Sequence, residues 1–420
     1  MARSALLRGL GNGIMVFVSI AVALVVVEFG LRVHFYGTLA EPDFGQTLHD
    51  PHPTRGWTLK PGIQAAKQEL DYTVHVTVNR LGVRGPEIGY ERQPGTFRIL
   101  VVGDSAMFGS GVDNDHTVPA LLTSQLAPLK VEVINLSVAA YSTVQEYLLF
   151  MDEGRRYRPD LVLLAFSPGN DIQTNYQPLQ QLYQKSQRRP FASLDADGRL
   201  QIDVHYAERE AKRRAKLAQR GPVWKFFQNS VLLRLVGAAR DKFVSARAVD
   251  PNIFLGWPQL AEFDEKLGLE GRTKADYEKL WGEAWAVTRA LIREMQRESR
   301  AMGAEFGLFV ATSMLQGDAG AQQRVREAFP GVQLDIGMID REMERFAGEI
   351  GAPFLDILPA IQAATTQGGP EPLFYQFQDE HWTRAGNRVV AEALARELRE
   401  KKLLWGGSTA LMEDSAKRGD

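Results

Sequence analysis

Ser105 is the residue whose type and position are best suited to chemistry. It stands in Gly103-Asp104-Ser105, directly after the apolar stretch FRILVV. A serine hydroxyl becomes a good nucleophile only when a base takes its proton, and an acid commonly orients that base. His381 and Asp379, in the C-terminal segment QDEHW, are the candidates for these two roles. These residue types predict acyl transfer through a covalent acyl-serine.

The spacing of Asp379 and His381 restricts the backbone that can carry them. Residues two apart point to different sides of a helix but to the same side of an extended segment. Asp379 can therefore orient His381 only if this stretch is a loop or extended. Pro372 before it and Gly386 soon after it favour a loop.

Acyl transfer also needs donors for the negative oxygen of its tetrahedral intermediate. Two candidates follow predicted strands: Asn170, in Gly169-Asn170-Asp171, and the backbone N–H of Ala140. Each segment has a structural alternative. Asn170 and Asp171 could form a turn, and Asn135 could cap a helix.

The elements that must position these residues alternate along the chain. Short apolar, β-branched runs predict buried strands from Phe97 and at Lys130–Leu136, Asp160–Phe166 and Glu305–Thr312, with Ala352–Leu355 as a short last candidate. Helical patterns lie between them at Thr143–Arg155, Leu280–Met302 and Ile339–Ile350. This alternation predicts a parallel sheet covered by helices on both faces. The chemistry is then expected at the carboxyl ends of the strands.

Four motifs occur in a fixed order: GDS, N-x-x-x-x-A, GND and D-x-H-W. Together with the phrases GWTLKPG, VNRLGVRGPE and RPDLVLLAF, they resemble the SGNH (GDSL-like) hydrolase superfamily, in particular its N-terminally anchored bacterial members. The motifs cover about Gly56–Asp171 and Glu305–Arg396 and leave the middle of the chain unexplained. The resemblance implies a three-layer α/β/α, flavodoxin-like fold and ester or acyl-transfer chemistry.

The resemblance also implies a role for each site residue. Ser105 would be the nucleophile, His381 its base and Asp379 the residue that orients the base. The oxyanion hole would consist of the Ser105 N–H, the Ala140 N–H and the Asn170 side chain. This chemistry needs neither a cofactor nor a metal.

Two features depart from the usual family pattern. The family usually has glycine where this chain has Ala140, so a positive φ there would strain the backbone. The acid lies two residues before His381 instead of three, where this chain has Gln378. That spelling resembles the branch that includes periplasmic polysaccharide O-acetyltransferases of the alginate type. Trp382 could form the floor of a sugar or acyl site, or belong to the core.

The apolar run Gly13–Val27 predicts a membrane-spanning helix. Continued through Arg32, it gives roughly 20 residues, enough to cross a hydrocarbon core of about 30 Å. Arg3 and Arg8 precede it and favour a cytoplasmic N-terminus, with the remainder in the periplasm or outside the cell. No small-x-small cleavage site follows, which favours an uncleaved signal anchor. Glu28 and Arg32 are spaced to pair on one helix face.

The chain divides into six expected regions: an anchor (1–36), a spacer with a small β-rich lead-in (37–95), the two parts of the SGNH domain (96–175 and 276–405), a mostly helical insertion between them (176–275), and a polar tail (406–420). Within the insertion, Tyr206–Arg220 is expected to be a solvated helix. The amphipathic stretch Val223–Val244 could pack on the domain, which we favour, cover the site as a lid, or lie on the membrane.

Composition excludes several other functions. A net charge of −2 gives no field that favours nucleic acid, and the absence of cysteine excludes a thiol nucleophile or a cysteine-bound metal. His49 and His52 are more consistent with a turn than with a metal site. The sequence thus predicts a serine ester hydrolase for an acylated (O-acetylated) glycan or lipid. The alternatives are an O-acyltransferase to a polysaccharide hydroxyl and a non-catalytic glycan-binding protein.

Overall fold

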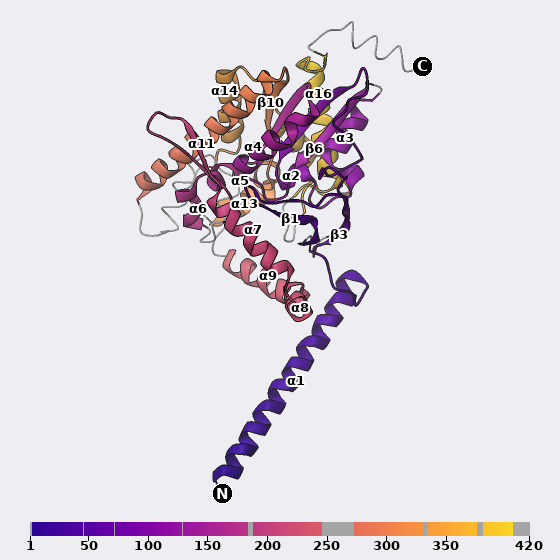
Figure 1. Cartoon of the computed structure of the whole chain (residues 1–420), viewed down its shortest axis with the longest axis vertical. Helices are drawn as coiled ribbons and strands as arrows, with labels where there is room; N and C mark the ends of the chain where they lie inside the picture. The colour runs from indigo at the N-terminus through magenta and orange to yellow at the C-terminus, as the bar shows by residue number, and fades with distance from the viewer. Residues whose placement is uncertain are drawn as a thin grey trace.

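We analysed a computed structural model of the 420-residue chain. It describes the chain except residues 1, 45, 71, 128, 184–187, 246–272, 329, 331–333, 376–380 and 406–420. Figure 1 labels helices and strands along the chain, from α1 at the N-terminal end to α16 near the C-terminal end. Asp379, Gln378 and the polar tail predicted at 406–420 lie outside the described residues.

The centre of the structure is a parallel sheet of four strands in the order β10-β7-β5-β6. Its strands are β5 (Phe97–Gly103), β6 (Val131–Ser137), β7 (Leu161–Phe166) and β10 (Glu305–Val310). They are almost wholly buried, as expected for strands covered on both faces. All four main predicted strands are therefore confirmed. The short candidate at Ala352–Leu355 forms only an isolated parallel bridge, between Phe354 and Leu308.

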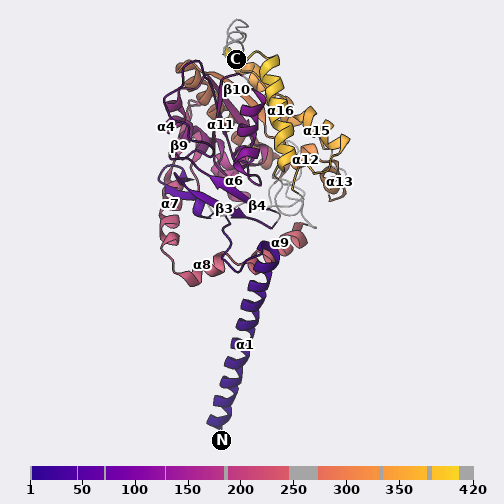
Figure 2. The ribbon, with the colours of Figure 1, turned by 90° about the vertical axis from the view of Figure 1, so that its right-hand side faces the viewer.

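Helices cover both faces of this sheet. One group packs α3 (Val118–Gln125) on β6 and on α16 (Arg384–Glu400); the other includes α4 (Thr143–Asp152), α5 (Pro168–Asn175) and α11 (Lys274–Ala301). Figure 2 shows α16 on one side of the sheet and α4 with α11 on the other. Further helices complete the domain: α2 (Ser105–Phe108), α12 (Met314–Gly317), α13 (Ala319–Ala328), α14 (Met338–Ile350) and α15 (Leu358–Gln367). The result is the expected three-layer α/β/α fold.

Two antiparallel hairpins precede the sheet: β1 (His49–His52) with β2 (Gly56–Leu59), and β3 (Gln64–Gln68) with β4 (Thr73–Thr77). The segment HDPH, interpreted from sequence as a turn, is strand β1, because it pairs along its whole length with β2. Side chains such as Trp57 and Val76 are buried in the same core cluster as the central sheet. The lead-in is thus packed onto the SGNH domain.

Arg98, at the start of β5, joins the end of the lead-in to the sheet. Its side chain is only 1% exposed, and its guanidinium donates to the carbonyl oxygens of Gly89, Tyr90, Glu91 and Tyr157. The fifth donor, Nε, bonds to a carboxylate on β6 (2.7 Å). A buried cation is tolerable because each of its donors has an acceptor.

The insertion is mostly helical, as predicted, but differs in two details. It contains α6 (Gln177–Tyr183), α7 (His205–Ala218), α8 (Pro222–Gln228) and α9 (Val231–Ser245), and also an unpredicted hairpin of β8 (Phe191–Leu194) and β9 (Leu200–Asp203). The stretch Val223–Val244 is divided between two helices: α8 ends at Gln228, with Asn229 as its C-cap. Residues 246–272 of the insertion are outside the described part.

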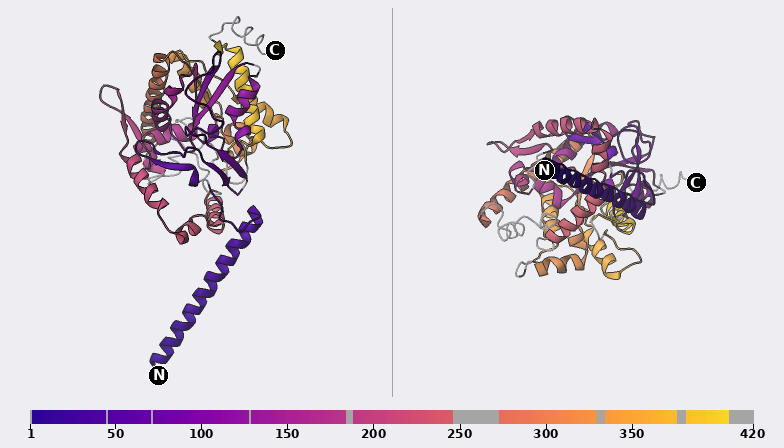
Figure 3. Two further views of the ribbon diagram at one scale, coloured as in Figure 1. Left: turned by 45° about the vertical axis from the view of Figure 1, so that its right-hand side comes forward. Right: turned by 90° about the horizontal axis from the view of Figure 1, so that it is seen from below.

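The N-terminal helix α1 (Ala2–Tyr36) projects from the domain (Figures 1 and 3). Its part from Gly11 to Tyr36 is long and apolar enough to cross a membrane. Apolar side chains along it, such as Phe17 at 73% exposure, are uncovered by the rest of the chain. The predicted pairing of Arg32 with Glu28 is confirmed by an Nε–Oε1 distance of 2.8 Å.

Replacing Arg98 with methionine is expected to lower the free energy of unfolding by about 3–5 kcal/mol, because the substitution leaves buried acceptors without a donor. Arg92→Met is the matched control. Arg92 pairs with Asp160 on the surface, and its loss should amount to about 1 kcal/mol or less. Urea unfolding of both variants measures the difference. Equal losses would show that burial of Arg98 adds no stability beyond that of a surface pair.

Candidate active site

Ser105 lies at the carboxyl end of a central strand, as predicted. Strand β5 ends at Gly103, and Asp104 caps the short helix α2 by accepting a hydrogen bond from Ala106 N (3.0 Å). Ser105 is the first residue of α2 and is half-buried. Its backbone N–H belongs to the first turn of a helix, where amides have no partner within the helix and can bind an anion.

His381 lies beside Ser105, with its Nε2 2.7 Å from Ser105 Oγ. It precedes the bridge residue Trp382, which pairs antiparallel with Phe374. Thr383 then caps helix α16. From His381 to Thr383 the chain is therefore non-helical. Asp379 lies outside the described residues, so its orienting role stays a prediction.

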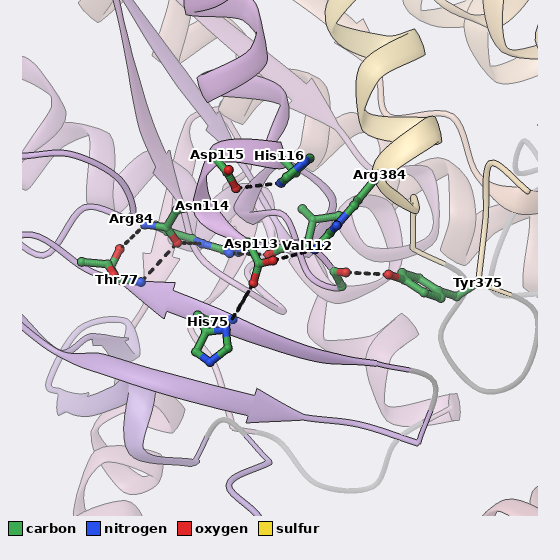
Figure 4. Close-up of polar contacts among 11 residues, drawn as sticks. His75, Thr77, Arg84, Val112, Asp113, Asn114, Asp115, His116, Tyr375 and Arg384 are labelled. Atoms are coloured by element: carbon green, nitrogen blue, oxygen red, sulfur yellow. Dashed lines mark hydrogen bonds and ion pairs between the residues drawn. The ribbon is translucent and has the colours of Figure 1, made fainter. Parts of the chain in front are cut away.

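Several contacts fix the His381 segment against the rest of the site. Trp382 Nε1 donates to Thr312 O (3.0 Å), just beyond β10. Tyr375 Oη donates to Gly111 O (2.6 Å), and Arg384 pairs with Asp113 (2.7 Å), both in the loop after the nucleophile helix (Figure 4). The interpretation of Trp382 as a sugar-binding floor is wrong, because its side chain is core: it is 2% exposed.

Gly111 permits one of these contacts. Its φ is +91°, and a Cβ there would lie 2.5 Å from a ring carbon of Tyr375. A side chain at this position would force the ring away and break the bond between Tyr375 and the Gly111 carbonyl.

Arg84, in the lead-in, binds the carboxyl end of the helix that begins with Ser105 and the loop that follows it. Its guanidinium donates to the carbonyl oxygens of Phe108, Gly109 and Val112 at 2.6–2.8 Å, and Nε donates to Asn114 Oδ1. Figure 4 shows Asn114 bonded in turn to Thr77 on β4. Burial lowers the pKa of Arg84 to about 9. The cation sits at the carboxyl end of α2, where carbonyl oxygens favour positive charge.

Ala140 has a φ of +63°. Backbone strain was expected here if φ were positive, because alanine stands where the family usually has glycine. The positive φ shows that this strain is present. Three bonds from other regions hold the turn in this conformation. Trp57 Nε1 donates to Ala139 O, Tyr141 Oη donates to Trp57 O, and Arg189 Nη1 donates to Ala140 O (3.1 Å). The lead-in and the insertion thus both fix this turn.

Asn135 is neither a helix cap nor exposed. It lies within β6, buried, and its Nδ2 donates to Met107 O (3.0 Å) in the nucleophile helix. The N-x-x-x-x-A motif therefore joins the strand that precedes the Ala140 turn to the helix that begins with Ser105.

The segment Gly169-Asn170-Asp171 is part of helix α5, so the interpretation of Asn170 and Asp171 as a simple turn is wrong. Asp171 is fully buried, and its Oδ2 accepts a hydrogen bond from Ser167 N (2.7 Å) at the start of this helix. Asn170 lies in the first turn of α5; its side chain is outside the described part of the structure.

Glu146 is a buried carboxyl near these motifs that the sequence did not reveal. Glu146, on α4, is fully buried, and within the described part of the chain neither of its carboxyl oxygens has a hydrogen-bond partner. Burial, reinforced by the carboxyls of Asp171 and Asp104, raises the pKa of Glu146 well above its ordinary value. Burial and Asp104 likewise raise the pKa of Asp171. Glu146 is therefore held in its neutral form.

One cluster in the described part of the chain has the composition of a metal site. Asp113, Asp115 and His116 place potential ligand atoms within 4.8 Å of one another. The Asp113 carboxylate, however, already accepts from His75 N (2.8 Å) and pairs with Arg384 (Figure 4). These contacts describe a structural ion-pair network.

The strand order, the helices on both faces, and the contact of Ser105 with a histidine just before the last helix agree with the arrangement implied by the motif resemblance. The fold is the three-layer α/β/α arrangement that the resemblance to the SGNH hydrolases implies. Of the residues predicted for the site, the structure brings together Ser105 and His381. It places Ala140 and Asn170 directly after β6 and β7, the two strands on either side of β5.

Neither family models nor curated proteins match this chain. Solved structures do. A Desulfitobacterium hafniense protein assigned to the G-D-S-L lipolytic family is 12% identical, with 72% of this chain and 99% of that chain covered and a TM-score of 0.33. A catalytic mutant of an acetylxylan esterase from Geobacillus stearothermophilus is 12% identical, with coverage of 72% and 94% and a TM-score of 0.35. An α/β hydrolase from the metagenome of Lake Arreo, Spain, is 11% identical, with coverage of 73% and 96% and a TM-score of 0.34.

Ala140→Gly is expected to keep or raise stability, by up to about 1 kcal/mol, because glycine removes the left-handed strain. Ala139→Gly is the matched control. Ala139 has no positive φ, so glycine there should destabilise by about 0.5–1 kcal/mol through backbone entropy. Thermal and urea unfolding compare the two. If both substitutions destabilised the protein equally, Ala140 would not be strained.

Glu146→Gln is expected to flatten the pH dependence of stability. The folded chain holds a proton on Glu146 that the unfolded chain releases near its ordinary pKa of 4.5. Wild-type stability therefore falls as pH rises from there through the raised folded pKa, by about 1.4 kcal/mol for each unit of difference. Glutamine is neutral at every pH, so the Glu146→Gln variant does not lose stability in this way.

Melting temperatures measured between pH 5 and 8 test this expectation, and the advantage of Glu146→Gln should grow with pH. Glu400→Gln, at the exposed end of α16, is the matched control and should follow wild type. Parallel curves for wild type and Glu146→Gln would show that Glu146 titrates as it does in the unfolded chain.

Proposed function

We propose that this chain is a serine ester hydrolase of the SGNH type that acts through an acyl-serine intermediate. The observation that carries the proposal is the 2.7 Å contact between His381 Nε2 and Ser105 Oγ at the carboxyl end of β5. That distance allows the imidazole to take the hydroxyl proton as a general base.

The first half-reaction forms the acyl-enzyme. Ser105 Oγ attacks the ester carbonyl carbon while His381 Nε2 takes its proton, and the carbonyl oxygen becomes an oxyanion. When the tetrahedral intermediate collapses, the C–O bond to the alcohol breaks and His381 returns the proton to the leaving oxygen. In this proposal Asp379 orients the imidazole.

The oxyanion is assigned to the Ser105 N–H, the Ala140 N–H and the Asn170 side chain. Two observations support this assignment. Ser105 N is in the first turn of a helix, and the Ala140 turn is held by contacts from two other regions. Donors fixed before the reaction stabilise the developing charge without reorganising.

The second half-reaction decides between hydrolase and transferase. Water, activated by His381, would release the acid; a sugar hydroxyl in the same place would instead become acylated. We propose water as the acceptor, with polysaccharide O-acylation as the alternative. A glycan-binding protein without catalysis is the third possibility, and the close contact of Ser105 with His381 argues against it.

The proposed location is a cell membrane, with the catalytic domain on its periplasmic or outer side. The long apolar part of α1 and the arginines that precede it support this orientation. A domain held there would meet acylated (O-acetylated) glycans or lipids, the substrate class we propose.

Ser105→Ala and His381→Gln are expected to lower the hydrolysis of a short-chain nitrophenyl ester by about 1,000-fold or more, because each removes a member of the proton-transfer pair. Ser124→Ala and His205→Gln, both on the surface, are the matched controls and should keep wild-type rates. Mass spectrometry of the quenched reaction should find an acyl group on Ser105 in wild type and in the two controls, and none at this position in Ser105→Ala.

An added oligosaccharide distinguishes the acceptors in the same assay. Free acid as the main product supports hydrolysis, and acylated sugar supports the transferase. If folded wild-type protein shows neither turnover nor an acyl-enzyme, the proposal of catalysis is wrong and the binding protein is favoured.

A further inference from the structure

The buried carboxylate of Glu28 joins the membrane helix to the insertion. Besides its pair with Arg32, it accepts hydrogen bonds from Ser230 Oγ (2.8 Å), Val231 N (3.0 Å) and Leu232 N (2.9 Å). These two amides begin helix α9, so a carboxylate on α1 caps a helix about 200 residues later in the chain. Glu28 and Arg32 are each 2% exposed.

Helix α8 is attached at the same point. The Arg32 guanidinium lies 5.0 Å from the ring centre of Phe226 and 5.5 Å from that of Phe29, and the two rings are 6.1 Å apart. Stacking of a guanidinium on aromatic rings adds to the capping bonds. Both α8 and α9 are therefore fixed to the C-terminal part of α1.

These two helices expose large apolar side chains. On α8, Val223, Trp224 and Phe227 are 71%, 44% and 56% exposed; on α9, Leu233 and Val236 are 54% and 57% exposed. Figures 1 and 2 show α8 and α9 at the end of the domain from which α1 projects, and Figure 3 shows the same end from below. Exposed apolar side chains on neighbouring helices at one end of a domain mark an interaction surface.

The surrounding charge is basic. Lys212, Lys216, Arg220 and Lys225, in and between α7 and α8, are exposed. The Arg220 guanidinium lies 4.1 Å from the ring centre of Trp224. Tryptophan beside a basic side chain is a pairing typical of the membrane–water interface, where the ring enters the headgroup layer and the cation meets phosphate.

We infer that α8 and α9 form a membrane platform that rests in the headgroup layer of the bilayer crossed by α1, with anionic phospholipid as its partner. The platform consists of Val223, Trp224, Phe227, Leu233 and Val236. The sequence favoured simple packing of Val223–Val244 on the domain, with a lid or a membrane position as alternatives. The stretch does pack, on α1 through Glu28 and on the lead-in through Arg234, which pairs with Glu69; the membrane position is proposed for its exposed side chains. The inference rests on the proposed anchoring of α1 and is independent of the proposed esterase activity.

Continuity with α1 distinguishes this partner from others. Large exposed apolar side chains of α1 form a dense run from Ile14 to Val27, directly before Glu28, and recur at Val33 and Phe35 within the Gly11–Tyr36 part that is long enough to cross a membrane. The helices capped by Glu28 are thus held at the level where the apolar segment ends, which is the membrane interface. The expected depth of the platform side chains is about 5–10 Å below the headgroup boundary.

The chain has no cysteine, so single cysteines can carry an environment-sensitive fluorophore in the full-length protein. We would label Val223→Cys and Val236→Cys in vesicles of phosphatidylcholine with phosphatidylglycerol. Both labels should be blue-shifted, quenched by nitroxide lipid, and several-fold less accessible to aqueous iodide than a label at Ser124→Cys on α3. Val16→Cys reports separately whether α1 is in the acyl chains.

The outcomes separate the two proposals. One outcome would place the Val16 label in lipid while the labels at Val223 and Val236 are as accessible to iodide as the label at Ser124. This outcome would overturn the platform and leave the anchor intact. A Val16 label in water would overturn the anchor. Equal insertion into pure phosphatidylcholine vesicles would overturn the anionic partner, and disulfide cross-linking between copies through Val236→Cys would favour a second copy. Ester hydrolysis, measured on the same samples, tests the catalytic proposal by itself.

Discussion

The hydrogen bond between Ser105 and His381 joins two residues 276 positions apart, and among the described residues no strand pairing links their segments. Contacts around the pair hold the Ser105 and His381 side chains at hydrogen-bond distance. Trp382 fixes the histidine segment to the carboxyl end of β10, while Tyr375 and Arg384 connect it to the loop that follows the nucleophile helix. A reacting pair held in this way needs little reorganisation when an ester binds, which is the main contribution that a protein scaffold makes to such chemistry.

Buried arginines explain why the lead-in belongs to this scaffold. Arg84 supplies donors to the carboxyl end of the nucleophile helix, and Arg98 supplies them to backbone carbonyls at the end of the lead-in. A guanidinium presents five donors in a fixed plane, so one side chain can satisfy several carbonyls that would otherwise be buried without partners. The lead-in therefore completes the hydrogen bonding of the catalytic domain as well as covering its core.

The sequence allowed much of this to be predicted, because the signals were local. The four main strands are short apolar runs, and Ser105 and His381 occur in motifs of a few residues. Other features depend on partners far away in the chain. The capping of α9 by Glu28 joins residues about 200 apart, and the burial of Glu146 leaves no local pattern. Trp382 shows that a local signal can also mislead. Its position next to His381 in the sequence could not reveal that its ring is buried in the core.

Two locally unfavourable features lie close together after β6. Ala140 has a left-handed backbone conformation, and the buried carboxyl of Glu146, without a hydrogen-bond partner among the described residues, lies on the helix that follows it. Each feature opposes folding, and the Ala140 turn is held by hydrogen bonds from Trp57 and Arg189, which lie outside the central sheet. Local unfavourable choices of this kind collect at functional sites, where geometry matters more than stability. Two of the insertion's contacts join regions far apart in the chain: Arg189 donates a hydrogen bond to the Ala140 turn, and α9 is capped by Glu28 of α1.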